Sequence, residues 1–585
     1  MFDNSFLKKI TEFSKKKKPK NYSKVGIQVI SDVIFQPLDK YIPFFLEKFR
    51  IDASFKIGNY DQLNFDLNSL DKDNLTEWQF IYIHSSTLKY LAQASGVKNS
   101  NLPKEFDDLI INFLVLIERA IKNTPSIQFI VNLFELPPYR IRGTNSTKSD
   151  LVQSILKVNE SIINLTKTYN NVIIHDANYI SASLGLSSWY DFSSWAAFKQ
   201  PFSGNALKSH AASLAAIIAG TLGKSKKLLI CDLDNTLWGG IIGDDGVDKI
   251  HLGHDTHKGE IFLLVQSFVR SLQAQGIVLG ISSKNEKKNA MLGFSKKKSI
   301  LKFDDFANKK INWSPKSENI KSMLQELNFG AESAVFIDDN PVEIDEVSGA
   351  IPQCECISYS KTPIEFIKLI DSLGLFETQN ITQDDLIRNK SYMQNSERKK
   401  SKETFKDHRE FLSSLNMKSV FYWNITFDIQ RISNLVNKTN QFNISQKILP
   451  ATEVNTYISD SEKFLLSADL TDKFGFNGII TVIFGKISSN ILFIENWVMS
   501  CRVFNRNMEI AVLEMLANKA VKLKIKTIKI PIQYSSKNDY CVSFFKNSGF
   551  KKKEKSSGSI YEVEPSVFLK KIGKNYESSI DFEIY

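Results

Sequence analysis

Two aspartates that directly follow an apolar strand constrain this chain more than any other feature. The run KKLLICDLDNT places Asp232 and Asp234 at the end of a predicted buried strand. On an extended chain, a spacing of two residues points both carboxylates to the same side. The carboxyl end of such a strand is where open α/β sheets bind ligands, and paired carboxylates there can hold Mg²⁺ against a phosphate. One carboxylate can attack phosphorus while the other donates a proton to the leaving group.

Three further features follow in the order that this chemistry needs. A predicted strand ends in Ser282 and Ser283, whose hydroxyls can bond phosphoryl oxygens. Lys316 in WSPK supplies a cation for developing negative charge, and a third strand ends in Asp338 and Asp339, which add oxygen ligands for a metal. Asp pairs at strand ends often only cap the next helix. The four features together nevertheless favour a catalytic site.

The order of the predicted elements indicates more than one domain. A chain of 585 residues suggests three or four domains, at about 100–200 residues each. Strands alternate with helices in residues 1–225 and again in 226–375, which predicts parallel α/β sheets. A polar connector (376–415) follows, and residues 416–585 read as a third domain of strands and helices.

Composition and charge argue against several classes of protein. The net charge of +11 is spread over 585 residues without a basic, aromatic stripe, so we expect no nucleic-acid partner. The most apolar stretch, 211–222, is too short to span a membrane, and the N-terminus lacks the core of a signal peptide. Five scattered cysteines form no disulfide framework, so the expected compartment is the cytoplasm.

The motifs and their order resemble the haloacid dehalogenase-like (HAD) superfamily. The phrases CDLDNTLWGGIIGDDG, SSKNE, WSPKSENI and FIDDNPVE are similar to its FkbH-like branch, subclass IIIC. NKTNQFNIS, DKFGFNG and MSCRVFNR extend the likeness over roughly 226–555, and SWYDFSSWAAFKQPFS looks more loosely like that family's SGNH-hydrolase-like N-terminal part. The C-terminal part resembles the acetyltransferase-like (GNAT) fold. The resemblance implies a multidomain α/β protein: an SGNH-like domain, a HAD-like Rossmannoid parallel sheet and an α+β GNAT-like domain.

The resemblance to the superfamily also implies a role for each site residue. Asp232 is then the nucleophile that accepts the phosphoryl group, and Asp234 is the acid and base, with its backbone carbonyl on Mg²⁺. Asp338 completes the metal site, and Asp339 is a ligand or lies beside one. Lys316 holds the phosphoryl group. The residues expected to bind substrate around it are Ser282, Ser283, Lys284 and Asn285.

FkbH-like proteins load a glyceryl group from 1,3-bisphosphoglycerate onto an acyl carrier protein. The resemblance therefore implies Mg²⁺ as cofactor, a phosphorylated small-molecule substrate and a carrier-protein partner. Two alternatives stay open: a plain phosphatase for a phosphorylated small molecule or sugar, and a non-enzymatic scaffold, which the complete acidic set disfavours. The stretch between Asp232 and Ser282 is too short for a large cap domain, which suits a bulky or protein-tethered substrate.

Acyl transfer raises a chemical problem, because attack of Asp232 on an acyl phosphate would waste its activation. A thioester requires a thiolate to attack carbon. Cys501 is one candidate, since Arg502 and Arg506 nearby are expected to lower its pKa and to contact substrate. Cys231 is expected to face the opposite side of its strand as a buried hydrophobe. The thiol of the carrier's own pantetheine is the third possibility.

The run from Arg502 to Asn507 matches the turn that binds coenzyme A pyrophosphate in GNAT proteins. Asn505 and Asn507 replace its two glycines. Asparagine tolerates a positive φ better than most residues, so we expect the turn to persist. The added side chains crowd a phosphate, which favours a pantetheine-arm or a structural role over ordinary coenzyme A binding.

Two other signals are interpreted without a catalytic role. His251, His254 and His257 are expected to be solvated, because no zinc-spaced partners accompany them. Ser31 would be the nucleophile of an SGNH hydrolase, but no Asp-x-x-His motif occurs before residue 226. We therefore expect the N-terminal domain to be catalytically silent, with Ser31 only capping the next helix.

Overall fold

The computed structural model describes most of the chain. The described residues are 4–15, 22–70, 77–94, 102–378 and 392–585, except 126, 141–142, 150, 297, 393, 396, 399–400, 403, 426–428, 440, 446–448, 450, 536–537, 549, 556–557 and 576–579. Residues 379–391 of the predicted connector thus lie outside them. The chain divides into two compact units: unit 1 is Met1–Thr221 with Ser372–Gln379, and unit 2 is Leu222–Asp371 with Asn380–Tyr585.

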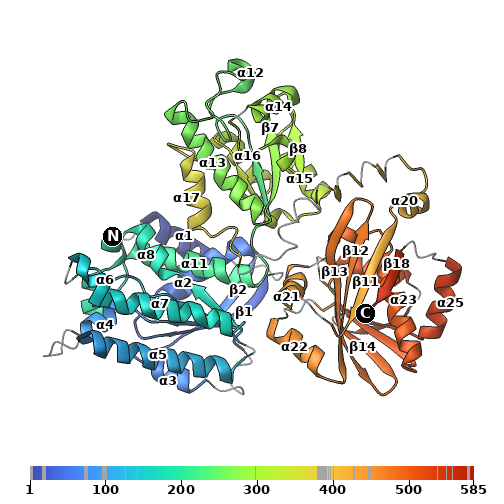
Figure 1. Ribbon diagram of the computed structural model, residues 1–585, viewed down its shortest axis with the longest axis horizontal. Helices are drawn as coiled ribbons and strands as arrows, with labels where there is room; N and C mark the ends of the chain where they lie inside the picture. The colour runs from blue at the N-terminus through green and yellow to red at the C-terminus, as the bar shows by residue number, and fades with distance from the viewer. Residues whose placement is uncertain are drawn as a thin grey trace. The chain divides into compact units, whose positions relative to one another are not determined.

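Unit 1 is built on a five-stranded parallel sheet in the order β2-β1-β3-β4-β5 (Figure 1). The strands are β1 Ser23–Ser31, β2 Ile51–Ile57, β3 Phe80–His84, β4 Gln128–Asn132 and β5 Val172–His175. The central strands β3 and β4 are buried on both faces, as expected when helices cover a parallel sheet. The helices α5 (Leu102–Asn123) and α7 (Leu151–Thr168) share a hydrophobic cluster with these strands.

The remaining helices of unit 1 are short except for α11. They are α1 Asn4–Lys15, α2 Leu38–Leu46, α3 Leu63–Asn68, α4 Thr87–Ala94, α6 Ser146–Ser149, α8 Ala177–Leu184, α9 Leu186–Trp189, α10 Phe192–Phe198 and α11 Gly204–Thr221. Helix α11 is almost entirely buried, which explains the uninterrupted apolar run in its sequence. None of the described helices of the chain is long and apolar enough to cross a membrane.

The middle region of the chain, residues 222–371 of unit 2, has a second five-stranded parallel sheet. Its order is β10-β9-β6-β7-β8. The strands are β6 Leu228–Cys231, β7 Val278–Ser283, β8 Asn308–Ile311, β9 Ala334–Ile337 and β10 Glu355–Ile357. The helices are α12 Ile242–Asp245, α13 His257–Ala274, α14 Lys287–Ser295, α15 Lys316–Leu327, α16 Pro341–Ala350 and α17 Ile364–Ser372. The carboxyl ends of β6, β7 and β9 all meet at one edge of this sheet.

Helix α15 packs directly against this sheet. Its Ile320, Met323 and Leu324 share a hydrophobic cluster with β6, β7 and β9. The contact is close at Gly280 of β7, where a Cβ atom would collide with the sulfur of Met323. This packing fixes the first residue of the helix, Lys316, beside the carboxyl edge of the sheet.

The C-terminal region of unit 2 has a mixed eight-stranded sheet in the order β16-β17-β15-β14-β13-β12-β11-β18. Its strands are β11 Met417–Trp423, β12 Lys463–Asp472, β13 Gly475–Ser488, β14 Ile491–Met499, β15 Thr527–Gln533, β16 Lys551–Lys555, β17 Gly558–Val563 and β18 Ile580–Ile584. Its helices are α20 His408–Ser414, α21 Ile429–Lys438, α22 Ala451–Ser459, α23 Met508–Lys522, α24 Asp539–Asn547 and α25 Pro565–Asn575. The predicted multidomain α/β class with parallel sheets is confirmed.

Strands β14 and β15 separate along their length. They pair in parallel only between residues 491–493 and 527–529. Beyond that point Ile444 lies between them: its N–H donates to the Trp497 carbonyl (3.2 Å), and its carbonyl accepts from the Gln533 N–H (2.8 Å). The side chains of Phe442 and Ile444 are fully buried in the surrounding core. The chain itself therefore fills the gap between the two strands.

Candidate active site

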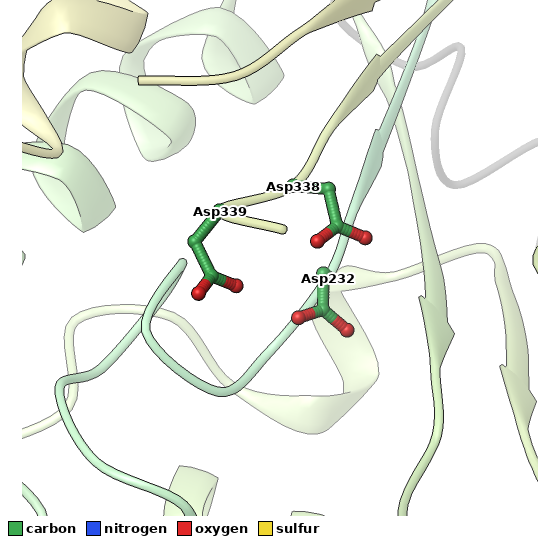
Figure 2. Close-up of side chains that lie close together, drawn as sticks. All are labelled: Asp232, Asp338 and Asp339. Carbon is green, nitrogen blue, oxygen red and sulfur yellow. The ribbon is translucent and has the colours of Figure 1, made fainter. Parts of the chain in front are cut away.

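Three carboxylates meet at the carboxyl edge of the middle sheet (Figure 2). Asp232 follows β6, and Asp338 and Asp339 follow the neighbouring strand β9. One carboxylate oxygen from each lies within 4.8 Å of the others. Oxygen-only donors with an excess of negative charge suit a hard divalent cation such as Mg²⁺. The residues present therefore fit the predicted metal site.

Lys316 joins two of these carboxylates. Its Nζ lies 2.9 Å from Asp232 Oδ1 and 2.5 Å from Asp338 Oδ2. Burial opposes a charged lysine, but the two carboxylates outweigh it and raise the pKa of Lys316. Burial and the charge of Asp232 raise the pKa of Asp338, and they raise the pKa of Asp339 to about 6. A single lysine thus leaves this group of acids with uncompensated negative charge.

Asp234 is held in place by three hydrogen bonds. Its Oδ1 accepts from Trp238 Nε1 (2.8 Å) and from the N–H of Ile242 (3.1 Å), and its Oδ2 accepts from Asn285 Nδ2 (2.9 Å). Burial raises the pKa of Asp234, which favours the protonated form that a general acid requires. Asn235 turns the chain at this point with a φ of 55°.

The predicted substrate-binding residues fall into different environments. Ser282 is fully buried at the end of β7, and its hydroxyl has no hydrogen-bond partner among the described residues. Ser283 is also buried. Lys284 forms an ion pair with Glu343 (2.5 Å), and Asn285 bonds to Asp234. The structure therefore gives Ser282 a free hydroxyl at the site and makes Asn285 a support for the acid.

Sequence reasoning missed the role of Trp238. This side chain is fully buried and donates to Asp234. A tryptophan four residues after an acid could have been suspected, because a buried indole N–H needs an acceptor.

Comparison with known proteins agrees with this geometry. Residues 244–351 match the family model of haloacid dehalogenase-like hydrolases. The chain contains a HAD-like hydrolase domain. No curated protein sequence matches the chain significantly.

Among solved structures, the chain is similar to the N-terminal part of protein BF1531 from Bacteroides fragilis, which contains a phosphatase domain complexed with Mg. The identity is 28%, the match covers 64% of this chain and 99% of that chain, and the TM-score is 0.59. The N-acetyltransferase PaiA from Thermoplasma acidophilum, complexed with coenzyme A, matches 20% of this chain and 70% of its own at 18% identity and a TM-score of 0.17. The ribosomal-protein-S18-alanine N-acetyltransferase of Escherichia coli matches 25% of this chain and 90% of its own, at 10% identity and a TM-score of 0.20. The last two likenesses are too weak to support a function.

The two candidate cysteines differ from one another. Cys231 is fully buried in β6, and burial raises its pKa, so the prediction of a core residue is confirmed. Cys501 opens the turn after β14 and is half-buried, with its Sγ 4.0 Å from the Asn328 carbonyl. Burial raises the pKa of Cys501 despite the opposing charges of Arg502 and Lys227. The predicted lowering of this pKa is therefore wrong, because desolvation exceeds the effect of the cations.

The position of Cys501 also matters for catalysis. Asn328 follows the C-terminal end of α15, whereas Lys316 begins that helix. Helix α15 has 12 residues, and a rise of about 1.5 Å per residue makes it about 17 Å long. The structure therefore does not bring Cys501 to the carboxylates.

The turn after Cys501 has the backbone geometry that the sequence indicates. Asn505 and Asn507 have φ values of 62° and 61°, so the prediction that asparagine preserves the turn is confirmed. The turn is covered, however. Phe504 stacks on Tyr540 at 4.0 Å, and the Asn505 N–H donates to the Tyr540 hydroxyl (3.1 Å). A phosphate would have to displace this contact.

The carboxyl edge of the unit 1 sheet holds a histidine cluster that sequence reasoning missed. The hydroxyl of Tyr82 lies 2.8 Å from His84, 3.0 Å from His175 and 2.7 Å from His210. Burial lowers the pKa of each histidine. His175 and His210, which look isolated in the sequence, are therefore neighbours. Ser31 accepts a bond from the N–H of Val33 (3.1 Å), whereas the next helix, α2, has Pro37 at its N-cap, so the prediction that Ser31 caps that helix is wrong.

Two carboxyls are buried beside this cluster. Asp32 accepts bonds from the hydroxyl of Ser85 and from the N–H of Ser86 (3.4 Å), and Lys89 lies 3.7 Å away. Glu135 accepts from the hydroxyl of Ser86 (2.8 Å). Burial raises the pKa of Asp32 to about 6 and that of Glu135 to about 7. Ser86 therefore bridges the two carboxyls, with its N–H on Asp32 and its hydroxyl on Glu135.

Two of the three histidines of the middle region are exposed, and His251 is half-buried where its backbone pairs with Gly239. His254 is exposed and lies 3.4 Å from Glu260, and His257 begins the exposed end of α13. His251, His254 and His257 belong to no cluster of metal-ligating side chains among the described residues.

Proposed function

We propose that the HAD-like domain is a Mg²⁺-dependent phosphatase whose nucleophile is Asp232. The observation that carries this proposal is the ion-pair network of Lys316 with Asp232 (2.9 Å) and Asp338 (2.5 Å) beside a three-carboxylate group. The similar phosphatase domain of BF1531, complexed with Mg, supports the choice of metal.

Each side chain has a defined task in this reaction. Asp232 attacks phosphorus, and the bond from phosphorus to the leaving oxygen breaks as Asp234 protonates that oxygen. Water then cleaves the aspartyl phosphate, with Asp234 taking its proton. Lys316 and the free hydroxyl of Ser282 bind phosphoryl oxygens. Asp232, Asp338, Asp339 and the carbonyl of Asp234 would hold Mg²⁺, which would neutralise charge on the phosphoryl group.

The proposed substrate is 1,3-bisphosphoglycerate or a related hydroxyacyl phosphate, and the proposed acceptor is the thiol of an acyl carrier protein. The support is the FkbH-like resemblance of the motifs around Asp232 and Cys501. In the transfer step a thiolate, from Cys501 or from the carrier, attacks the carbonyl carbon. The bond from that carbon to the phosphate oxygen breaks, and phosphate leaves with the electron pair. The Asp232 site then removes the other, ester-linked phosphate, so the activated bond is not wasted.

An intact-mass experiment tests this proposal. The full chain is incubated with Mg²⁺, 1,3-bisphosphoglycerate and a panel of carrier proteins. The expected result is a carrier carrying a glyceryl group, with release of phosphate. Release of phosphate without any acylated protein would contradict the acyl transfer and would support phosphatase activity alone. An unchanged rate of release by Asp232→Asn would contradict the nucleophile.

A plain phosphatase is the second candidate. It is favoured by the raised pKa of Cys501 and by its position at the other end of α15 from Lys316. In that case Cys501→Ala releases phosphate at the rate of the native chain, and no thioester forms on any thiol.

A further inference from the structure

Unit 2 contains a cavity of about 940 Å³ that lies away from the carboxylate site. Its walls come from the end of α15, from the turn 501–506 with Tyr540, and from six described residues between them in the chain: Tyr392, Asn395, Arg398, Lys402, His408 and Phe411. Lys316 lies at the opposite end of α15, so the cavity is separate from the proposed phosphatase site. The volume falls within the range typical of small-molecule sites.

A buried group of charges forms part of the cavity. Arg398 binds Asp472 through two bonds of 2.7 Å, and Arg506 binds the same carboxylate at 3.1 Å. Both arginines also donate to Asn395, at 2.8 Å and 2.6 Å. Arg398, Arg506 and Asp472 are only 3%, 7% and 5% exposed. Two cations thus share one anion in a place where uncompensated charge is costly.

The other charged residues on the walls do not restore neutrality. Lys402 adds a cation and Asp539 adds an acid. Arg502 and Glu326 have partners of their own, which include Ser500 (3.1 Å) and Lys310 (2.5 Å). Among the described residues, Arg398, Arg506 and Lys402 therefore exceed Asp472 and Asp539 by one positive charge. An anion such as a phosphate monoester would balance it.

The rest of the cavity suits an organic body. Phe504 and Tyr540 present a stacked aromatic pair, Asn328 and Gln441 offer amide groups, and the thiol of Cys501 lies on the wall. The gap between β14 and β15 offers no alternative route to this thiol, because Ile444 bonds to both strands there. A ligand bound in the cavity therefore lies beside Cys501, which lines its wall.

We propose that this cavity binds an organic phosphate and holds it beside Cys501, with Arg398, Arg502, Arg506 and Lys402 binding its phosphate. The inference deepens the acyl-transfer part of the proposed function, but it rests on different residues from the phosphatase. The phosphate can belong to a small metabolite or to the phosphopantetheine arm of a carrier, and the experiment separates these sources.

Protection of Cys501 from iodoacetamide tests this site in the full chain. Alkylation is followed by peptide mass spectrometry in Asp232→Asn, so that probes are not consumed. The probes are two pairs, 3-phosphoglycerate with glycerate and S-methyl phosphopantetheine with S-methyl pantetheine, whose capped sulfur does not react with iodoacetamide. At ten times its Kd, a phosphorylated probe should slow alkylation of Cys501 about tenfold. The probe of either pair that lacks phosphate should protect far less, and half-buried Cys356 is the internal control.

Variants of two cations on the cavity wall complete the test. Lys402→Gln combined with Arg502→Gln should abolish protection, whereas Lys406→Gln, outside the cavity, should retain it. Circular dichroism checks that each variant is folded. Protection by 3-phosphoglycerate indicates a metabolite, and protection by S-methyl phosphopantetheine alone indicates a carrier arm. Failure of both phosphorylated probes, or protection that survives the double variant, would overturn the proposal. The experiment measures alkylation of Cys501 and not phosphate release. Its outcome therefore does not depend on whether the proposed phosphatase activity is correct.

Discussion

The chain contains two parallel five-stranded sheets, and each gathers buried acids where its strands end. In unit 1, Asp32 and Glu135 each accept a bond from a serine hydroxyl and are bridged by Ser86, and burial favours their neutral forms. In the HAD-like domain, one oxygen each of Asp232, Asp338 and Asp339 lies within 4.8 Å of the others, and a single lysine contacts the first two. The position at the strand ends is the same. What marks the second edge as a site for chemistry is the charge that its own residues leave uncompensated.

The largest expected difference between the two edges is in catalysis. Asp232→Asn removes the proposed nucleophile while keeping the shape of the side chain, so kcat for phosphate release should fall by about 10³-fold or more. Asp32→Asn, at the other edge, should change kcat less than about twofold. Release of phosphate from a small phosphate ester in the presence of Mg²⁺ measures both. Equal losses of kcat in the two variants would show that the two sheet edges do not differ in catalysis.

Substitution of the lysine at each edge, Lys316 or Lys89, should also change kcat to very different extents. Lys316→Met removes the cation that contacts Asp232 and Asp338, and kcat should fall by about 10²-fold because the phosphoryl charge loses a partner. Lys89→Met, which removes the cation near Asp32, is the matched control and should leave the rate within about twofold. A rate for Lys316→Met close to the native value would show that the lysine only stabilises the fold.

Mg²⁺ should stabilise the chain by binding at the carboxyl edge of the middle sheet and not at that of the unit 1 sheet. A ligand present at a hundred times its Kd adds about 2.7 kcal/mol to the free energy of unfolding. Mg²⁺ should therefore raise Tm in thermal denaturation, and a chelator should reverse the rise and stop phosphate release. Asp338→Asn should lose this rise, whereas Glu135→Gln should keep it. A rise of equal size in Asp338→Asn would contradict the assigned metal site.

The last prediction concerns the pH dependence of stability in unit 1. The pKa of Glu135 rises from 4.5 to about 7 on folding, so its contribution to stability is fully present below pH 4.5 and is lost as pH rises through 7. Glu135→Gln removes this loss and should stabilise the chain by up to about 3 kcal/mol at pH 8. At pH 4 the two proteins should be equally stable. Urea unfolding at both pH values measures the difference, and greater stability of the native chain at pH 8 would contradict it.

The sequence predicts local features of the site well. Strand ends with acids, the turn at Asn505 and Asn507, and the buried face of Cys231 all depend on neighbouring residues and on strand alternation. Features set by distant parts of the chain are not predicted. The contacts among Tyr82, His175 and His210 need β3, β5 and α11 to meet, and no spacing in the sequence records that.

The error at Cys501 has a similar physical origin. Its basic neighbour Arg502 can be read from the sequence, and that cation does act to lower the pKa as expected. The depth of the thiol in the fold cannot be read in this way, and desolvation is the larger effect. Arg506, counted as a second basic neighbour, instead binds Asp472, which is 34 positions away in the chain.

The helix that begins at Lys316 and leads to Asn328 has one more consequence. It acts as a stiff spacer of about 17 Å between a hydrolytic centre and a thiol. A three-carbon acid phosphate is far shorter than this spacer and cannot touch both ends at once. Any reaction that uses both must therefore proceed in separate stages, with the intermediate carried from one end to the other.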